Sequence, residues 1–224
     1  MKLKTLFLTL MLSLVLGFSS CTQCKSGDAV ADVDSTELVQ TKSLVVENVI
    51  SADREAMFLQ YKQDYRWFET CIVMKDFLDE EPSEIDTLQA GPAIAGISNV
   101  FMYVDSISER SFDTSVVLFS HTPDSATVEV KPHAFWVEDM PLNEAEIKLT
   151  FAQAYERLME ANVVKPHSRN CVLRREVGAK DANAQYIFGN THTCIFVDAV
   201  TGDVRLEDPA FEGIKLAKPL GEWP

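Results

Sequence analysis

The apolar and polar positions of the chain separate a short apolar start, a polar stretch and a long body with periodic patterning. Residues 6–18 are mostly apolar, whereas residues 22–42 are rich in Ser, Thr, Asp and small side chains and show no sustained period. From about Leu44 onwards, apolar positions recur every three to four residues or every second residue, which are the periods of helices and strands. We therefore expect the ordered body to begin near Leu44.

The first half of the body, residues 44–143, is predicted to contain one helix followed by strands. Ser51 suits the N-cap position of a helix, and Asp53 lies where the positive end of the helix dipole favours an acid. Apolar and aromatic residues then recur at helical spacing between residues 57 and 65. Turn residues separate four β-branched or aromatic runs that we predict to be strands, at residues 67–78, 99–105, 115–120 and 126–137.

The second half, residues 144–224, is predicted to contain one helix and then an antiparallel meander. Thr150 and Gln153 have the spacing of a capping box, in which each side chain bonds to the backbone of the other residue. Pro166 ends the helix before residue 165, and strands are predicted at residues 170–177, 185–188, 194–199 and 203–206. The apolar tail at residues 209–224 is expected to pack back over the body. The predicted fold class is α+β, with two units that each combine a helix with an antiparallel meander sheet.

The sequence Ile-Phe-Val-Asp-Ala-Val-Thr-Gly-Asp-Val at residues 195–204 resembles the closing signature of PepSY domains, in which a strand, a tight Thr-Gly turn and a short return strand follow one another. Residues 149–154 resemble the helix start of that family and residues 185–188 its middle strand, so the resemblance extends over residues 147–208. It implies a PepSY-like second unit. It also implies a non-enzymatic regulatory or inhibitory role, often beside proteases.

The residues of this turn signature, Asp198, Thr201 and Gly202, also have a purely structural explanation. Gly202 can adopt the positive φ of a tight turn without steric cost, and the side chains of Asp198 and Thr201 can bond to nearby backbone amides. A direct binding role of Asp198 is the alternative. Residues 100–105 loosely echo residues 193–198 without the Thr-Gly turn, so the first unit is either a diverged copy of the second or an independent use of a common arrangement.

The apolar start resembles the signal of bacterial lipoproteins. Lys2 and Lys4 precede the apolar run, the small residues Ser19 and Ser20 are typical of a cleavage site, and Cys21 follows. The resemblance implies that residues 1–20 are a signal peptide, that Cys21 is lipidated (with palmitate among its acyl chains) and that residues 21–43 form a flexible tether. We therefore expect a lipoprotein of the bacterial cell envelope, held at a membrane, most naturally the outer membrane, by its N-terminal lipid.

The formal charge of −14 on 224 residues makes the chain strongly acidic. Phosphate backbones would be repelled by such a chain, which argues against nucleic acids as partners. A solvated surface that aids solubility is the simple explanation of the charge.

Besides Cys21, the chain has four cysteines, at positions 24, 71, 171 and 194. Export would place them in an oxidising compartment, where a disulfide between Cys171 and Cys194 could form between predicted strands of the second unit. His167 and His192 are near these cysteines in sequence, so the four residues are also a candidate zinc set, although their spacing matches no zinc-finger pattern. Reduced, buried cysteines are the third explanation.

The sequence contains no serine nucleophile elbow, no phosphate-binding glycine loop and no zinc-protease helix motif. We therefore expect neither enzymatic activity nor a cofactor, and we interpret the chain as a non-catalytic module that binds an envelope protein or inhibits a peptidase. Two alternatives stay open: a hydrolase whose site the sequence does not reveal, and a structural component of the envelope.

Overall fold

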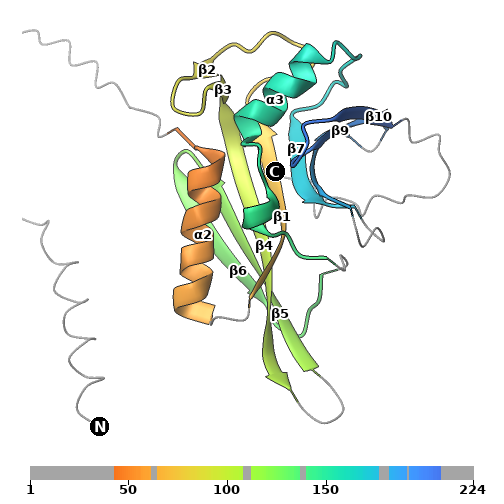
Figure 1. Ribbon diagram of the computed structural model, residues 1–224. Coiled ribbons are helices and arrows are strands. Elements are labelled where there is room, and N and C mark those ends of the chain that lie inside the picture. Colours follow the sequence, from red (N-terminus) through yellow and green to blue (C-terminus); the bar gives the residue numbers. More distant parts are fainter. Residues whose placement is uncertain are drawn as a thin grey trace, which may run out of the picture. The chain divides into compact units, whose positions relative to one another are not determined.

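The computed structural model describes residues 43–61, 65–107, 112–136, 140–176, 182–190 and 192–207 (Figure 1). All described residues belong to one compact unit. The predicted signal peptide, Cys21 and the tail at residues 209–224 lie outside the described residues, as does nearly all of the predicted tether.

The described residues form two α-helices, one short 3-10 helix and ten β-strands. In chain order, these elements are α2 (Val46–Tyr61), β1 (Arg66–Met74), β2 (Ile85–Asp86), β3 (Gly91–Pro92), β4 (Ile94–Ile107), β5 (Phe112–Thr122), β6 (Ser125–Lys131), η1 (Glu144–Glu146), α3 (Phe151–Glu160), β7 (Asn170–Arg175), β8 (Ala184–Gly189), β9 (Cys194–Asp198) and β10 (Val204–Glu207). Eight strands form one antiparallel sheet in the order β10-β9-β8-β7-β1-β4-β5-β6, and β2 pairs with β3 separately. The fold class is therefore α+β, as the sequence pattern predicts.

The helix α3 begins where the sequence predicts it, because Thr150 and Gln153 form the capping box. The Thr150 hydroxyl accepts a hydrogen bond from the backbone N–H of Gln153 over 3.2 Å, and the Gln153 side chain accepts one from the N–H of Thr150 over 2.9 Å. The buried face of the helix consists of apolar side chains at helical spacing: Phe151, Ala154, Tyr155 and Leu158. The ring centroids of Phe151 and of Phe188 on β8 are 6.0 Å apart, so this face of the helix packs on the sheet.

The helix α2 begins earlier than the sequence pattern predicts. Ser51, the expected N-cap, is an exposed residue inside the helix, which starts at Val46. The prediction is wrong because acids follow Ser51 at the positions where acids are favoured in the first turn of a helix. The apolar stripe of the helix, however, already begins one turn earlier. That stripe comprises Val46, Ile50 and Met57, with Asp53 among them.

Both helices pack on the same face of the large sheet. On this face, Ile97, Ile72, Cys171, Phe188 and Ile195 lie directly opposite one another across the five adjacent strands β4, β1, β7, β8 and β9. All five side chains belong to one hydrophobic core, which also holds the buried apolar residues of α2 and α3. Figure 1 shows α2 running alongside β4, with which it is in contact.

Several strand boundaries differ from the predictions. β1 ends at Met74 rather than at residue 78, although Leu78 is still buried, and β6 ends at Lys131 rather than at residue 137. These are places where buried or apolar residues continue beyond the last ladder pair, so the sequence pattern runs on after the strand has ended. Within the described ranges, neither α-helix has the length and apolar character that crossing a membrane requires.

Candidate functional site

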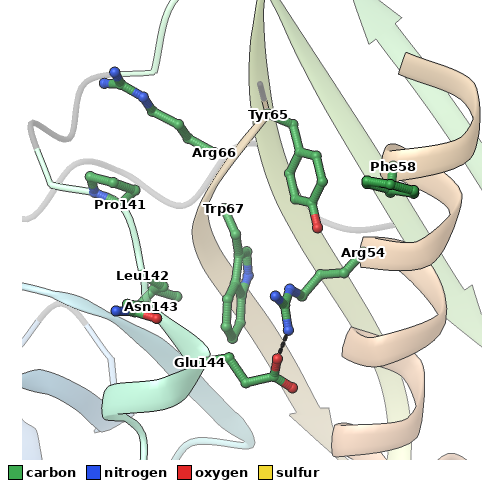
Figure 2. A pocket seen from close by; sticks show the side chains of 9 residues that line it. All are labelled: Arg54, Phe58, Tyr65, Arg66, Trp67, Pro141, Leu142, Asn143 and Glu144. Carbon is green, nitrogen blue, oxygen red and sulfur yellow. Dashed lines mark ion pairs between the residues drawn. The ribbon is translucent and has the colours of Figure 1, made fainter. Parts of the chain in front are cut away.

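A pocket of about 340 Å³ lies between α2, the start of β1 and the segment that leads into η1. The Leu142 backbone N–H donates a hydrogen bond to the carbonyl oxygen of Trp67 over 2.6 Å, which fixes two walls of the pocket to each other. The side chains that line it are drawn in Figure 2: Arg54, Phe58, Tyr65, Arg66, Trp67, Pro141, Leu142, Asn143 and Glu144. The pocket therefore combines aromatic rings with two guanidinium groups and one carboxylate.

An ion pair joins two walls of this pocket. Figure 2 shows the Arg54 side chain reaching from α2 to the carboxylate of Glu144 in η1, with which it forms the pair. The Arg54 and Glu144 side chains are 30% and 57% exposed, so water reaches both partners. Exposed ion pairs of this kind contribute only about 0–1 kcal/mol to stability. A carboxylate from another molecule could therefore replace Glu144 beside Arg54 at small cost.

Apolar surface lies next to this guanidinium group. Phe58 is one helical turn after Arg54 on α2, so the two side chains are neighbours on the helix surface. Phe58 is 52% exposed, whereas Trp67 is 4% exposed. An apolar side chain that covered the Phe58 ring would be stabilised by about 25 cal/mol for each Å² of apolar surface removed from water. The pocket thus offers a place for a carboxylate beside a place for an apolar group.

Trp67 connects the pocket to a chain of buried polar side chains beneath α2. Its ring N–H donates a hydrogen bond to the Thr70 hydroxyl over 3.1 Å, and that hydroxyl donates one to the side-chain oxygen of Asn99. The Asn99 amide in turn donates to Asp53 over 2.7 Å. At the far end, Nε2 of His121 lies 2.9 Å from Oδ1 of Asp53. The chain therefore links residues of β1, β4, α2 and β5.

These partners explain how Asp53 tolerates a position where it is only 3% exposed. Burial raises the pKa of the Asp53 carboxyl, while the hydrogen bond from Asn99 and the charge of His121 act in the opposite direction. Histidine–aspartate pairs also occur in hydrolytic sites, where the imidazole contacts a nucleophile as well. Among the described residues, the hydrogen bonds of the His121 ring go to Asp53. We therefore interpret this pair as one that satisfies a buried acid.

The turn signature forms the hairpin between β9 and β10. Gly202 has a φ of +81°, which a glycine adopts without strain. Oδ1 of Asp198 accepts hydrogen bonds from the backbone N–H groups of Val200 and Thr201 over 2.8 and 2.9 Å. The Asn183 side chain donates to Oδ2 of Asp198 over 2.9 Å. Both oxygens of Asp198 are thus occupied, Oδ1 by the turn and Oδ2 by Asn183 just before β8, which favours its structural explanation over a direct binding role.

The cysteines do not form the predicted bridge. No disulfide joins Cys171 to Cys194, and β8 lies between the strands that carry them. They also face opposite sides of the sheet, because Cys171 belongs to the main core and Cys194 to a small cluster with Ile187 and Phe196 on the other face. Burial raises the pKa of the Cys171 thiol well above its usual value, so it remains protonated.

Cys71, the third described thiol, is also held in its protonated form. Burial raises its pKa well above the usual value, and the neighbouring charge of Glu69 adds to the rise. The Cys71 thiol donates a hydrogen bond to Oε1 of Glu69 over 3.0 Å. A thiol without thiolate character is a poor nucleophile, so neither Cys71 nor Cys171 fits a catalytic role.

The four candidate zinc residues do not come together in one site. The His167 ring stacks on Phe77 with 3.8 Å between the ring centroids and bonds to Asp79 through Nδ1. His192 is exposed in the loop before β9, while Cys171 and Cys194 face opposite sides of the sheet. In the part of the chain that the structure describes, no group of three or more His, Cys, Asp or Glu residues is arranged to hold a metal ion.

Neither the pocket nor the buried polar chain is recognised from the sequence. Asp53 does carry a local signal, because it occupies the same helical stripe as Ile50 and Met57, where an acid needs a buried partner. The pocket has no such signal, since Arg54 and Glu144 are far apart in the sequence and belong to no common motif.

Comparisons of this chain with protein-family models, with curated proteins and with solved structures give no match. The function proposed below therefore rests on the sequence and on the chemistry of the described residues.

Proposed function

We propose that this chain is a lipid-anchored module outside the cytoplasm that binds an envelope protein or a peptidase and catalyses no reaction itself. The anchoring part of the proposal rests on the lipoprotein-like start of the sequence and on Cys21. The binding part is carried by one observation: the exposed Arg54–Glu144 ion pair lies beside the exposed ring of Phe58 in a single pocket.

The order of elements supports the proposal of two units, each a helix followed by a meander. α2 precedes β1, β4, β5 and β6, which are consecutive neighbours in the sheet, and α3 precedes β7, β8, β9 and β10, which are neighbours in the same way. The two sets meet where β1 pairs with β7. This arrangement, together with the Thr-Gly turn, favours a PepSY-like second unit and a diverged first copy.

The pocket chemistry favours a partner segment that carries a carboxylate next to an apolar side chain. The carboxylate would pair with Arg54 in place of Glu144, while the apolar group covers Phe58. Because the chain carries a charge of −14, a partner with many acids would be repelled. We therefore propose a partner segment with a single carboxylate in an otherwise neutral or basic surface.

Calorimetric titration of the full chain, kept in mild detergent, with three N-acetylated peptides tests this proposal. One peptide ends in Phe with a free carboxylate, the second is its C-terminal amide, and the third is an amide with Glu next to Phe. A hydrogen-bonded charge is worth about 1.5–3 kcal/mol, so at least one carboxylate peptide should bind roughly tenfold or more tightly than the plain amide. Equal binding of all three peptides, or no binding, would contradict the proposal. The first and third peptides distinguish a chain terminus from an acidic side chain.

A further inference from the structure

The strand β6 forms an exposed edge of the eight-stranded sheet. Among the described strands it is the last in the sheet order, and it pairs with β5 alone, in a regular register. Six of its seven residues are exposed, and among them Val128 and Val130 are 52% and 39% exposed. Proteins commonly protect such edges with lysine, proline or a bulge. In β6, Lys131 and the following Pro132 protect the end of the strand, whereas residues 125–129 carry none of these devices.

The hairpin between β5 and β6 determines which backbone groups face the open edge. Thr122 and Ser125 flank a two-residue turn and are paired. The pair of residues that flanks such a turn is hydrogen-bonded. Along an antiparallel ladder, hydrogen-bonded pairs alternate with pairs that are not hydrogen-bonded to each other. The backbone groups of residues 125, 127, 129 and 131 therefore face β5. Those of Ala126, Val128 and Val130 face outward.

We propose that β6 pairs with β6 of a second copy of this chain, antiparallel, about a two-fold axis at Val128. In this register Val128 lies opposite its own counterpart and Ala126 lies opposite Val130. All three outward-facing residues of each copy then form hydrogen-bonded pairs. Their side chains share one face of the strand, so the six apolar side chains of the two copies come together at the junction.

The charges of the strand fit this register. Asp124 in the hairpin turn is exposed, the Lys131 side chain at the other end of β6 is 43% exposed, and the two-fold axis brings Asp124 of one copy beside Lys131 of the other. Glu129 lies opposite Thr127, so no like charges face each other directly. A two-fold axis at Val130 would instead place Val128 opposite Pro132, which has no N–H to donate, and would leave the start of the strand unpaired.

The pairing is independent of the pocket and of its proposed ligand. One strand from each copy makes a small interface, at the lower end of the range for specific complexes, so we expect a dissociation constant on the order of micromolar.

Cross-linking through a new cysteine tests the register in the full chain. Residues in a hydrogen-bonded antiparallel pair have Cα atoms about 5.5 Å apart, which suits a disulfide. Val128→Cys should therefore form a covalent dimer under mild oxidation, with a cross-linked peptide that joins position 128 to itself. Thr127→Cys is the matched control, because position 127 lies opposite position 129 and faces the other side. Neither Thr127→Cys nor the parent chain with its native cysteines should form a covalent dimer under the same oxidation.

Sedimentation of the full chain in density-matched detergent tests the association itself. The protein mass should double as the concentration rises through the micromolar range. Val128→Lys, which places two positive charges opposite each other at the axis, should abolish this doubling without changing the thermal midpoint, because the side chain is exposed. A chain that remains monomeric, the absence of a 128–128 cross-link, or a Val128→Lys variant that still doubles in mass would each overturn the proposal.

Discussion

The side chain of Glu47, in the first turn of α2, accepts a hydrogen bond from the backbone N–H of Phe151, the first residue of α3, over 2.7 Å. The first N–H groups of a helix have no partner within the helix, and the positive end of the helix dipole favours a carboxylate there. One helix thus supplies a cap to the other. This contact adds to the sheet pairing of β1 with β7 in connecting the two halves of the body.

Glu47→Ala should lower the free energy of unfolding by about 0.5–2 kcal/mol, as the loss of other N-terminal caps does. Glu47→Gln keeps an acceptor oxygen without the charge and should lose less. Denaturant unfolding measures both changes. The inferred role of the carboxylate is incorrect if Gln at this position is as costly as Ala, or if neither substitution changes stability.

Gly202→Val should lower stability by about 1–3 kcal/mol, because a β-branched residue is strained at a φ of +81°. The space around Gly202 is not the cause, since an added Cβ would lie at ordinary contact distances of 3.5 Å or more from Arg157 and Leu149. Gly202→Asn is the matched control and should cost less, because asparagine tolerates positive φ. Equal thermal midpoints for all three proteins would contradict the backbone explanation.

Asp198 should make stability depend on pH in the acid range. Burial acts to raise the pKa of its carboxyl, but hydrogen bonds from Thr201, Asn183 and Val200 outweigh burial, so the pKa is lowered from 3.8. A carboxyl with a lowered pKa in the folded state contributes stability above its unfolded value, and this contribution is lost as the pH falls through the folded value.

The corresponding variant is Asp198→Asn, with unfolding measured between pH 7 and pH 2. At neutral pH the variant should be less stable than the parent chain by about 1 kcal/mol, the usual worth of a hydrogen bond. The difference should shrink as the pH falls below 3.8, the ordinary pKa of this carboxyl, and should be lost once the pH has passed through its lowered pKa in the folded chain. A difference that stays constant over the whole range would show that the charge of Asp198 is not what stabilises the turn.

Cys21→Ser tests the proposed anchor. If Cys21 carries lipid, the variant should leave the membrane fraction or retain residues 1–20 uncleaved, because serine cannot be lipidated in the same way. Fractionation with mass analysis of the N-terminus distinguishes these outcomes. A variant that is cleaved before residue 21 and still sediments with membranes would contradict the lipoprotein hypothesis.

The parts of the fold that local chemistry determines could be predicted from the sequence. Thr150 and Gln153 specify the start of α3 within four residues, and Gly202 marks a turn because other residues are strained there. The start of α2 could not be found in this way, since the polar residues around Ser51 give a stronger local signal than the apolar stripe that begins at Val46.

The parts that depend on pairing between distant segments could not be predicted. Nothing near Ile72 in the sequence indicates that it lies opposite Cys171, or that β8 separates Cys171 from Cys194. The disulfide and zinc hypotheses both required Cys171 and Cys194 to lie close together, which this strand order does not provide. The pocket depends in the same way on tertiary packing, because η1 brings Glu144 to Arg54 only once the sheet has formed.

The exchange of Glu144 for a ligand carboxylate at Arg54 is the central proposal, and two variants test it in opposite directions. In titrations with the carboxylate peptide, Arg54→Gln should weaken binding roughly tenfold or more, because the charged donor is lost. Glu144→Gln should instead tighten binding by up to about fivefold, because the competing exposed pair is worth about 0–1 kcal/mol. The predicted order of affinity is Glu144→Gln, then the parent chain, then Arg54→Gln. Weaker binding by both variants, or no change in either, would contradict the proposed site.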